Sequence, residues 1–270
     1  MKSLPLNYLV YPSLLNQYQR LLDSEVDAED FSNIDSESGD YRRTPEEIMA
    51  EREQDLIDSI NRVPHEPIEV ADRGTAFNEI VDCIILNKKS TRDDVVIRRI
   101  KPECSDEEFL HATINGFEFV FDANLCRKVA DYFKGSLPQH RCEGIVETKY
   151  GLVQLYGYAD YIFPAKVVDL KTCERYDFGK YAHNWQKEVY PYCLMQSGDM
   201  QECNMFEFYV VQLKAPTKAT PWITGVEYRE EYNYNHEKAT SDIRQITERF
   251  LDWLEAHKEQ ITDKKIFNYR

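Results

Sequence analysis

Two aspartates in a predicted hairpin carry the clearest chemical signal in this sequence. The stretch from Gly157 to Thr172 predicts two strands joined by a tight turn at Pro164-Ala165. With a two-residue loop, residues whose numbers add up to 329 face each other, as Asp160 and Asp169 do. Directly opposed residues share a sheet face, with Cβ atoms about 5 Å apart. Two facing carboxylates repel each other, and a divalent cation held between them would relieve that repulsion.

Lys171 adds a cation to the same face, because it lies two residues after Asp169 and a strand alternates its faces. Proteins usually hold Mg²⁺ by one or two carboxylates together with substrate phosphates, and the Leu170 carbonyl could add a third oxygen. A metal-bound water becomes acidic enough to attack phosphorus. Lys171 would orient that water or stabilise the developing charge. The pattern predicts a Mg²⁺ site for phosphodiester cleavage, at which Mn²⁺ can substitute; ordinary solvated charges are the alternative explanation.

Length and composition restrict the class of protein. A chain of 270 residues with 42% hydrophobic residues can form one large domain or two small ones. We expect neither a membrane span nor a secretory signal, because no run of 18 apolar residues and no basic-then-apolar N-terminus occurs. The seven cysteines include no C-x-x-C pair. That usage indicates reduced thiols in a cytoplasmic protein, without a zinc site or a disulfide framework.

The net charge of −15 opposes tight, nonspecific binding to duplex nucleic acid. This charge is unevenly distributed, because residues 23–58 contain fourteen acidic and three basic side chains. The rest of the chain is therefore close to neutral, and a basic groove can coexist with an acidic flank.

Periodicity predicts an α+β fold. The core, residues 71–90 and 143–230, is a central mixed sheet with a three-stranded meander flanked by helices, within a single domain 1–270. We also expect N-terminal and mid-chain helical additions, a long C-terminal helix, and an acidic mobile loop over 23–41. Expected helices start at Tyr11, with Ser13 as N-cap, and at Ser105, and cover 44–62, 71–87, 124–134, 180–196 and 237–262. Expected strands cover 144–150, 153–163, 166–172, 205–213 and 222–228.

Four short motifs in this chain resemble those of one nuclease family. Ser13–Tyr18 is similar to an S-x-L-x-x-Y opening, and Gly74–Asp82 to a first-helix motif. The hairpin matches G-x-x-D and D-x-K-T, and Gln186–Tyr190 matches Q-x-x-x-Y. Their order and spacing resemble the PD-(D/E)XK nuclease superfamily, in the branch of the RecB nuclease domain and phage recombination exonucleases. This resemblance implies a restriction-endonuclease-like α/β core.

The resemblance implies a divalent-metal-dependent DNA nuclease, an exonuclease of phage or prophage recombination or of bacterial DNA repair. Its substrate would be DNA with a free end, and a single-strand-annealing recombination protein would be a partner. Asp160, Asp169 and Lys171 would be catalytic. No iron–sulfur cluster is expected, because the closely spaced C-terminal cysteines of some relatives are absent.

Further site residues follow from the same resemblance. Asn78 occupies a position where many relatives carry a histidine metal ligand, and Glu147 matches an acid that binds a second metal or a water. Gln186 and Tyr190 would contact the strand being cut, although Pro191 predicts a kinked or shortened helix there. For Asn78 a solvated helix face is the alternative, with Glu79 or Asp82 as substitute ligands; for Glu147 it is a surface glutamate.

Two other classes remain open at this point. One is a catalytically weak DNA-binding module that retains the nuclease fold, which Asn78 and the acidic charge favour. The other is an interaction protein whose acidic loop is the binding surface. Binding of a divalent metal at Asp160 and Asp169 would separate the nuclease from the interaction protein.

Overall fold

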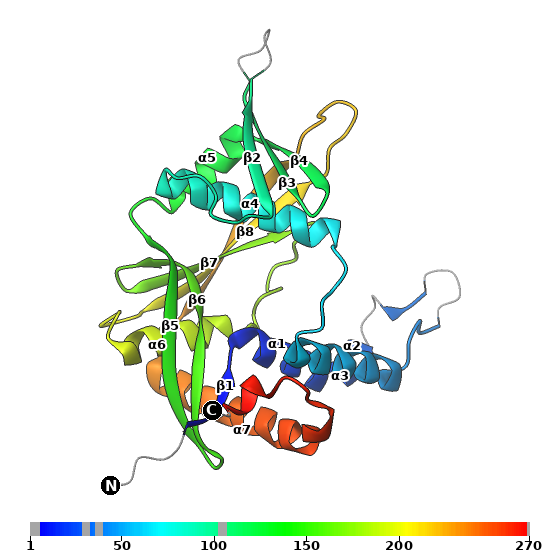
Figure 1. The fold of residues 1–270 in the computed structure, drawn as a ribbon, viewed down its shortest axis with the longest axis vertical. Helices are drawn as coiled ribbons and strands as arrows, with labels where there is room; N and C mark the ends of the chain where they lie inside the picture. The colour runs from blue at the N-terminus through cyan, green and yellow to red at the C-terminus, as the bar shows by residue number, and fades with distance from the viewer. Residues whose placement is uncertain (1–5, 29–32, 36–39, 102–106, 269–270) are drawn as a thin grey trace.

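A mixed six-stranded sheet forms the centre of an α+β fold, as the sequence predicts (Figure 1). The computed structural model describes residues 6–28, 33–35, 40–101 and 107–268. The strands are β1 (Leu6–Val10), β2 (Val95–Ile100), β3 (Phe109–Ile114), β4 (Phe117–Asp122), β5 (Leu137–Thr148), β6 (Gly151–Phe163), β7 (Lys166–Cys173), β8 (Met205–Lys214) and β9 (Thr224–Asn233). The helices are α1 (Pro12–Leu22), α2 (Ser24–Ala28), α3 (Pro45–Asn61), α4 (Glu69–Leu86), α5 (Ala123–Tyr132), α6 (Gln186–Ser197) and α7 (His236–Ala256).

The predicted meander is formed by β5, β6 and β7, which pair in antiparallel order. The crossover through α6 then places β8 parallel to β7, and β9 pairs antiparallel with β8. A strand buried on both faces reads as a nearly continuous apolar run, which explains the sequence of β8. The pairing of Phe163 with Lys166 confirms the two-residue turn, in which Ala165 has φ 60°.

One edge of β6 is shared by two strands that leave a gap between them. β1 pairs with Leu152–Leu155 in parallel, and β7 pairs with Tyr161–Phe163. Among the described residues, no strand pairs with the stretch 156–160 on this edge. Asp160 lies at the end of this gap, where β6 and β7 separate.

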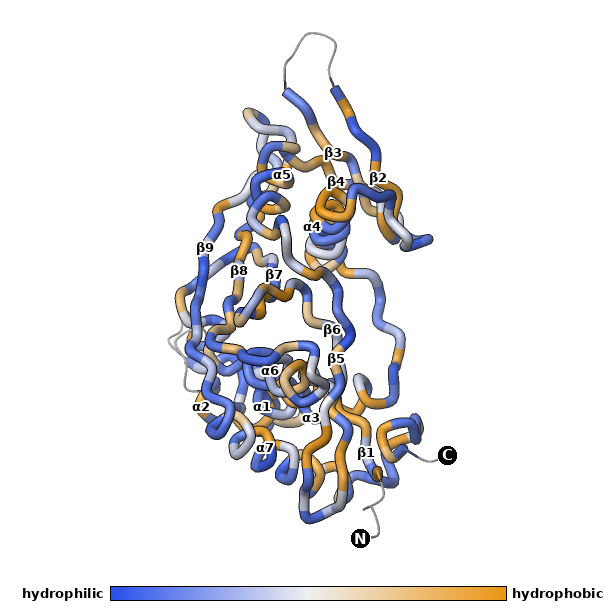
Figure 2. The backbone as a smooth tube through the Cα atoms, turned by 90° about the vertical axis from the view of Figure 1, so that its left-hand side faces the viewer, coloured by the Kyte–Doolittle hydropathy of each residue, from blue (hydrophilic) through white to orange (hydrophobic). Residues whose placement is uncertain are grey.

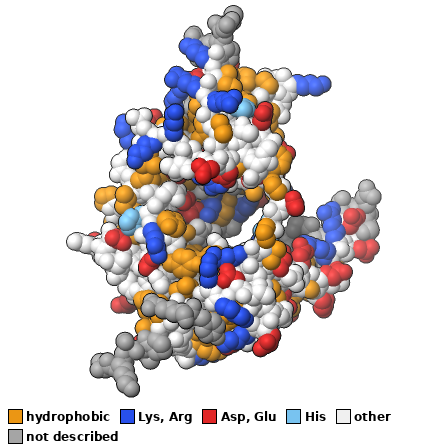
Figure 3. Space-filling view, in the orientation of Figure 1, with side chains coloured by type: hydrophobic (Ala, Val, Ile, Leu, Met, Phe, Trp, Pro, Cys, Tyr) orange, Lys and Arg blue, Asp and Glu red, His pale blue; other side chains and the backbone are white. Residues whose placement is uncertain are grey.

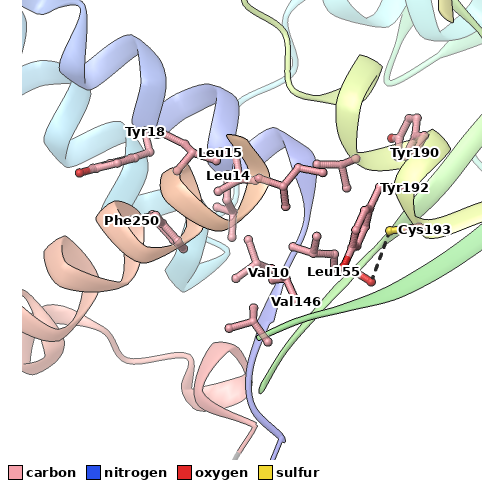
Figure 4. Packing of buried hydrophobic residues seen from close by; sticks show 14 of the residues in the cluster. Val10, Leu14, Leu15, Tyr18, Val146, Leu155, Tyr190, Tyr192, Cys193 and Phe250 are labelled. Carbon is pink, nitrogen blue, oxygen red and sulfur yellow. Dashed lines mark hydrogen bonds between the residues drawn. The ribbon is translucent and has the colours of Figure 1, made fainter. Parts of the chain in front are cut away.

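Two hydrophobic cores lie on the two sides of the sheet. One contains the buried side chains of α1, α3, α6 and α7, and the other contains those of α4, α5 and β2–β4. Adjacent residues of β7 supply different cores, Val167 the first and Val168 the second. Figure 2 shows α6 against β5 and β6, and α4 above β7. In the first core, Tyr18 of α1 packs edge-on against Phe250 of α7, with ring centroids 5.6 Å apart (Figure 4).

The mid-chain addition is a sheet as well as a helix, which corrects the expectation of helices alone. β2, β3 and β4 form a separate antiparallel sheet that packs on α4. β3 and β4 are joined by Asn115-Gly116, both with positive φ. Asn-Gly between alternating hydrophobic residues is a strong hairpin signal, because both turn residues must adopt positive φ. The sequence contained this signal, but the prediction missed the hairpin. The helix expected over 124–134 is confirmed as α5.

Several predicted boundaries also differ from the structure. The capping box of Thr44 and Glu47 at the start of α3 is confirmed. Ser13 is not an N-cap, because α1 begins after Tyr11 without a side-chain cap. The helix expected from residue 180 begins at Gln186, and Pro191 lies inside it.

Two predictions concern segments that are only partly described. Residues 23–41 were expected to form a loop. Part of this stretch is regular, because it includes α2 and a β-bridge between Ile34 and Tyr41. Residues 29–32 and 36–39 lie outside the described residues, as does Ser105, where a short helix was expected. The described Glu107 and Glu108 are not helical.

Candidate active site

The gap between β6 and β7 is closed by the side chain of Asp160. The last backbone pair of the two strands joins Tyr161 and Val168, in the register predicted from the sequence. Beyond it, the N–H of Leu170 donates to Asp160 Oδ2 at 3.0 Å instead of to a strand carbonyl. The carboxylate therefore takes the place of a backbone acceptor, which fixes it beside the Asp169–Lys171 segment of β7.

Asp169, Lys171 and Gln186 form a closed triangle of contacts on the α6 side of the sheet. Asp169 is 1% exposed; its Oδ1 accepts from Gln186 Nε2 at 2.9 Å, and its Oδ2 lies 2.6 Å from Lys171 Nζ. Lys171 Nζ in turn donates to Gln186 Oε1 at 2.6 Å. A buried carboxylate is tolerated when it is paired and hydrogen-bonded, as here. Gln186 therefore orients both reactive side chains of the D-x-K pattern.

Tyr190 completes this arrangement from the next turn of α6. Its hydroxyl oxygen accepts from Gln186 Nε2 at 3.1 Å, so the Gln186 amide serves Asp169 and Tyr190 together. The Tyr190 ring packs against Gly157 of β6, where a Cβ atom would lie 2.8 Å from Tyr190 Cε1. Gly157 is thus required for close packing of α6 on the sheet.

We expect Gly157→Ala to destabilise the protein by about 1–3 kcal/mol, because the added methyl group overlaps the Tyr190 ring. Thermal unfolding of Gly157→Ala, Tyr190→Leu and the double variant measures the coupling. The penalty should largely disappear in the Tyr190→Leu background. An unchanged melting temperature with weaker DNA binding would instead mean that Gly157 permits approach of a nucleic acid.

One face of α4 approaches the site from the opposite side of the sheet. Gly74, Asn78 and Asp82 are four residues apart and therefore share this face. A Cβ atom on Gly74 would overlap Thr172 Oγ1 of β7, so glycine permits the close approach. At the other end, Asp82 Oδ1 accepts from the Tyr161 hydroxyl of β6 at 2.6 Å.

Asn78 lies midway between these two anchored ends of the α4 face. It therefore faces the region between Thr172 and Tyr161, where Asp160 meets Leu170. Asn78 Oδ1 is buried and has no hydrogen-bond partner among the described residues. An unpaired buried acceptor is destabilising, which makes this oxygen a candidate for a ligand that the protein side chains do not supply.

Gln139 and Asp82 join the site although neither was among its predicted principal residues. Gln139 Nε2 donates to Asp82 Oδ2 at 3.1 Å and lies 3.5 Å from Asp160 Oδ1. Asp82 was considered only as a substitute for Asn78. Gln139 has φ 49° within β5, and a glutamine in an extended segment gives no sequence signal for such a position.

The protonation of Asp160 is strongly perturbed. Burial raises the pKa of its carboxyl to about 8, and the Asp169 carboxylate acts in the same direction. The Lys171 ammonium and the Leu170 N–H oppose this rise in pKa because they favour the charged form. Burial also raises the pKa of Asp82, against the hydrogen bond from Tyr161. A carboxyl group whose pKa is raised beside a second carboxylate is typical of a site that binds cations or protons.

Glu147 does not join this cluster. It is exposed and pairs with Leu152, eight residues along β6 from Asp160. At about 3.3 Å per residue that separation is about 26 Å. The position of Glu147 therefore does not support its predicted catalytic role. An exposed position agrees with the alternative, a surface glutamate.

The donor set fits a hard divalent cation with few protein ligands. No group of three or more His, Cys, Asp or Glu side chains suited to a metal occurs in the described part of the chain. Mg²⁺ needs only one or two carboxylates when phosphate and water oxygens complete its shell. Asp160, Asp169, the Leu170 carbonyl and the unpaired Asn78 Oδ1 are the oxygens that would hold it.

Two groups of helices lie on either side of β7. Figure 1 shows α4 and α5 above β7 and α1, α3 and α7 below it, with the chain from β7 to α6 passing between. In the space-filling view a hollow separates the two groups, and basic side chains are visible inside it (Figure 3).

Comparisons with known proteins add little. No family model and no curated protein matches the chain. One solved structure, described as the crystal structure of SSO0001, is 14% identical and aligns over 48% of this chain and 55% of its own, with a TM-score of 0.31. The match thus spans about half of that protein, and a likeness this low supports no inference.

No helix in the described ranges has both the length and the apolar character needed to cross a membrane.

Proposed function

We propose that this protein is a divalent-metal-dependent DNA nuclease of the PD-(D/E)XK type. It would hydrolyse phosphodiester bonds at a free DNA end, in phage or prophage recombination or bacterial DNA repair. The observation that carries the proposal is the convergence of Asp160, Asp169 and Lys171, held together by Gln186 and the Leu170 N–H.

Each side chain has a distinct part in this proposal. Mg²⁺ or Mn²⁺ held by Asp160 and Asp169 would supply an activated water and screen the phosphate charge. Lys171 Nζ, 2.6 Å from both Asp169 Oδ2 and Gln186 Oε1, would stabilise negative charge that develops on the phosphate. Gln186 and Tyr190 would position Lys171 and Asp169 against the strand being cut.

A cleavage assay tests the proposal directly. End-labelled linear DNA and closed circular DNA would be incubated with Mg²⁺, Mn²⁺ or EDTA. We expect degradation of the linear DNA with either metal, survival of the circle, and no reaction in EDTA. Glu147→Gln is a matched control, because this carboxylate lies far from the site and its loss should leave the rate unchanged. Equal cleavage in EDTA would disprove the proposal.

Asn78 offers a finer test of the same site. We expect Asn78→His to maintain or raise Mn²⁺-supported activity, and Asn78→Leu to lower it about tenfold or more, because leucine removes the unpaired oxygen. The measurement is the cleavage rate of each variant over a titration of Mn²⁺. Equal rates for asparagine, histidine and leucine would show that this side chain takes no part.

A second candidate is a DNA-binding module of low catalytic power that retains the nuclease fold. The observation that favours it is the occupation of both Asp169 oxygens, one by Gln186 and one by Lys171. A cation that takes Asp169 as a ligand must compete with these contacts. DNA binding without metal-dependent cleavage would support this candidate over the nuclease.

A further inference from the structure

An open groove lies beside the chain segment that connects β7 to α6, the two elements that carry Asp169, Lys171 and Gln186. Residues 174–185 follow the end of β7 at Cys173 and lead into α6 at Gln186. Between this segment and the α2–α3 region lies an open groove of ≈ 1060 Å³. Four basic side chains line it, Arg42, Arg43, Arg52 and Lys180, together with the acidic Asp27 and Asp177. Arg52 pairs with Asp27, which leaves an excess of basic side chains in the groove.

The groove collects the few basic side chains of an otherwise acidic part of the sequence. Residues 23–58 contain fourteen acidic side chains and only three basic ones, Arg42, Arg43 and Arg52, and all three line this groove. Arg43 pairs with Glu51, and Arg42 lies 3.8 Å from Asp35. Exposed ion pairs of this kind are weak, so phosphate groups can compete for the guanidinium groups. No carboxylate pairs with Lys180 within the described ranges; its Nζ donates to the Arg175 carbonyl at 3.0 Å.

An aromatic ring is held out in solvent at the wall of the same groove. Phe178 is 88% exposed and lines the groove. The backbone around it is firmly anchored, because the Gly179 N–H and the Tyr176 hydroxyl both donate to Oε1 of Glu230, at 3.0 Å and 2.7 Å. Glu230 is 2% exposed, so this anchor is part of the interior. These bonds fix the backbone on both sides of Phe178 and so keep its Cα at the wall of the groove.

Arg73 of α4 pairs with Glu174, which fixes the start of this segment next to the end of β7. At about 3.3 Å per residue, the seven residues from Lys171 to Phe178 span at most about 23 Å. A nucleic-acid strand of a few nucleotides is therefore long enough to contact both.

We propose that this groove binds the single-stranded part of a DNA substrate beside the cleavage site, with Phe178 stacking on a base and Arg42, Arg43 and Lys180 contacting phosphates. Surfaces that bind single strands combine a basic path with aromatic rings on which bases stack. The net charge of −15 leaves little long-range attraction, so a local basic path is what such a strand requires. This inference rests on the proposed nuclease function.

The test measures binding of a labelled single-stranded oligonucleotide to the full-length protein in EDTA, by fluorescence anisotropy. Phe178→Leu keeps an apolar side chain without a flat ring and should weaken binding about 5- to 100-fold, whereas Phe178→Trp should retain it. Lys180→Ala should reduce the slope of log affinity against log salt by about 0.7. Lys238→Ala, an exposed lysine of α7, is the matched control and should change neither quantity.

The outcomes separate the groove from the active site. If the wild-type protein cleaves DNA with Mg²⁺ but Phe178→Leu and Lys180→Ala bind and cleave as it does, the groove proposal is overturned alone. If the variants lose single-strand binding but the wild type cleaves nothing, the groove stands and the nuclease proposal fails. Absence of any binding or cleavage by the wild type overturns both. Melting temperatures of the Phe178 variants should match the wild type, because the ring is exposed.

Discussion

Asp169→Asn should lower the Mg²⁺-dependent cleavage rate by about 10³-fold or more, while the protein remains folded. Asparagine keeps the volume of this buried side chain but removes one of the two carboxylates that would hold the cation. The change also removes the like charge beside Asp160, so the melting temperature should stay the same or rise. Cleavage of end-labelled linear DNA at saturating Mg²⁺ gives the rate, and a thermal melt gives the stability.

Lys171→Met is the companion variant for this experiment. It should lose a similar amount of activity, but it leaves Asp169 and Asp160 without their cation and should therefore be less stable at high pH. A nuclease role requires that both variants lose activity and that only Lys171→Met loses stability. If Asp169→Asn no longer unfolded cooperatively, Asp169 would have to be reassigned to a structural role.

Cleavage should be about 50-fold slower at pH 6 than at pH 8, with a slope that approaches tenfold per pH unit as the pH falls. The physical reason is the Asp160 carboxyl, whose pKa is raised to about 8 and whose proton competes with the cation. Rates at subsaturating Mg²⁺ across pH 5.5 to 9 would show this dependence. A flat profile in that range would mean that Asp160 is ionised throughout or is not a ligand.

The same raised pKa predicts how stability depends on pH without metal. Between about pH 4 and pH 8 the folded state binds a proton at Asp160 that the unfolded state has lost, so the stability contribution of this group falls as pH rises. Asp160→Asn mimics the neutral form and should melt above the wild type by a margin that grows from pH 4 to pH 8. Melting in EDTA measures this margin, and Mg²⁺ should reduce it at pH 8.

The sequence predicted the hairpin of the site well, because local rules determine it. The turn at Pro164-Ala165 fixes the register, and strand alternation then places Asp169 and Lys171 on one face. The i, i+4 spacing of Gln186 and Tyr190 likewise placed both on one side of α6. These residues converge as predicted, although their catalytic roles remain to be tested.

Local sequence rules could not predict the features of the site that depend on contacts between distant segments. The separation of β6 and β7 at Asp160 depends on β1 and β7 sharing one edge of β6, and β1 was not predicted at all. Gln139 joins the site only because of its positive φ and the position of Asp82. Glu147 was misplaced because β6 is long, so that a position in the neighbouring strand does not imply proximity to Asp160.

The pairing of β1 with β6 has a consequence for folding during synthesis on the ribosome. β1 is synthesised well before its partner in β6, which follows roughly 145 residues later. At 5–20 residues per second, β1 must wait roughly 7–30 seconds for that partner. Throughout this interval the apolar residues of β1 have no sheet to join. Stalled nascent chains that end before β6 should therefore remain open to protease at Leu6–Val10, and longer ones should become protected.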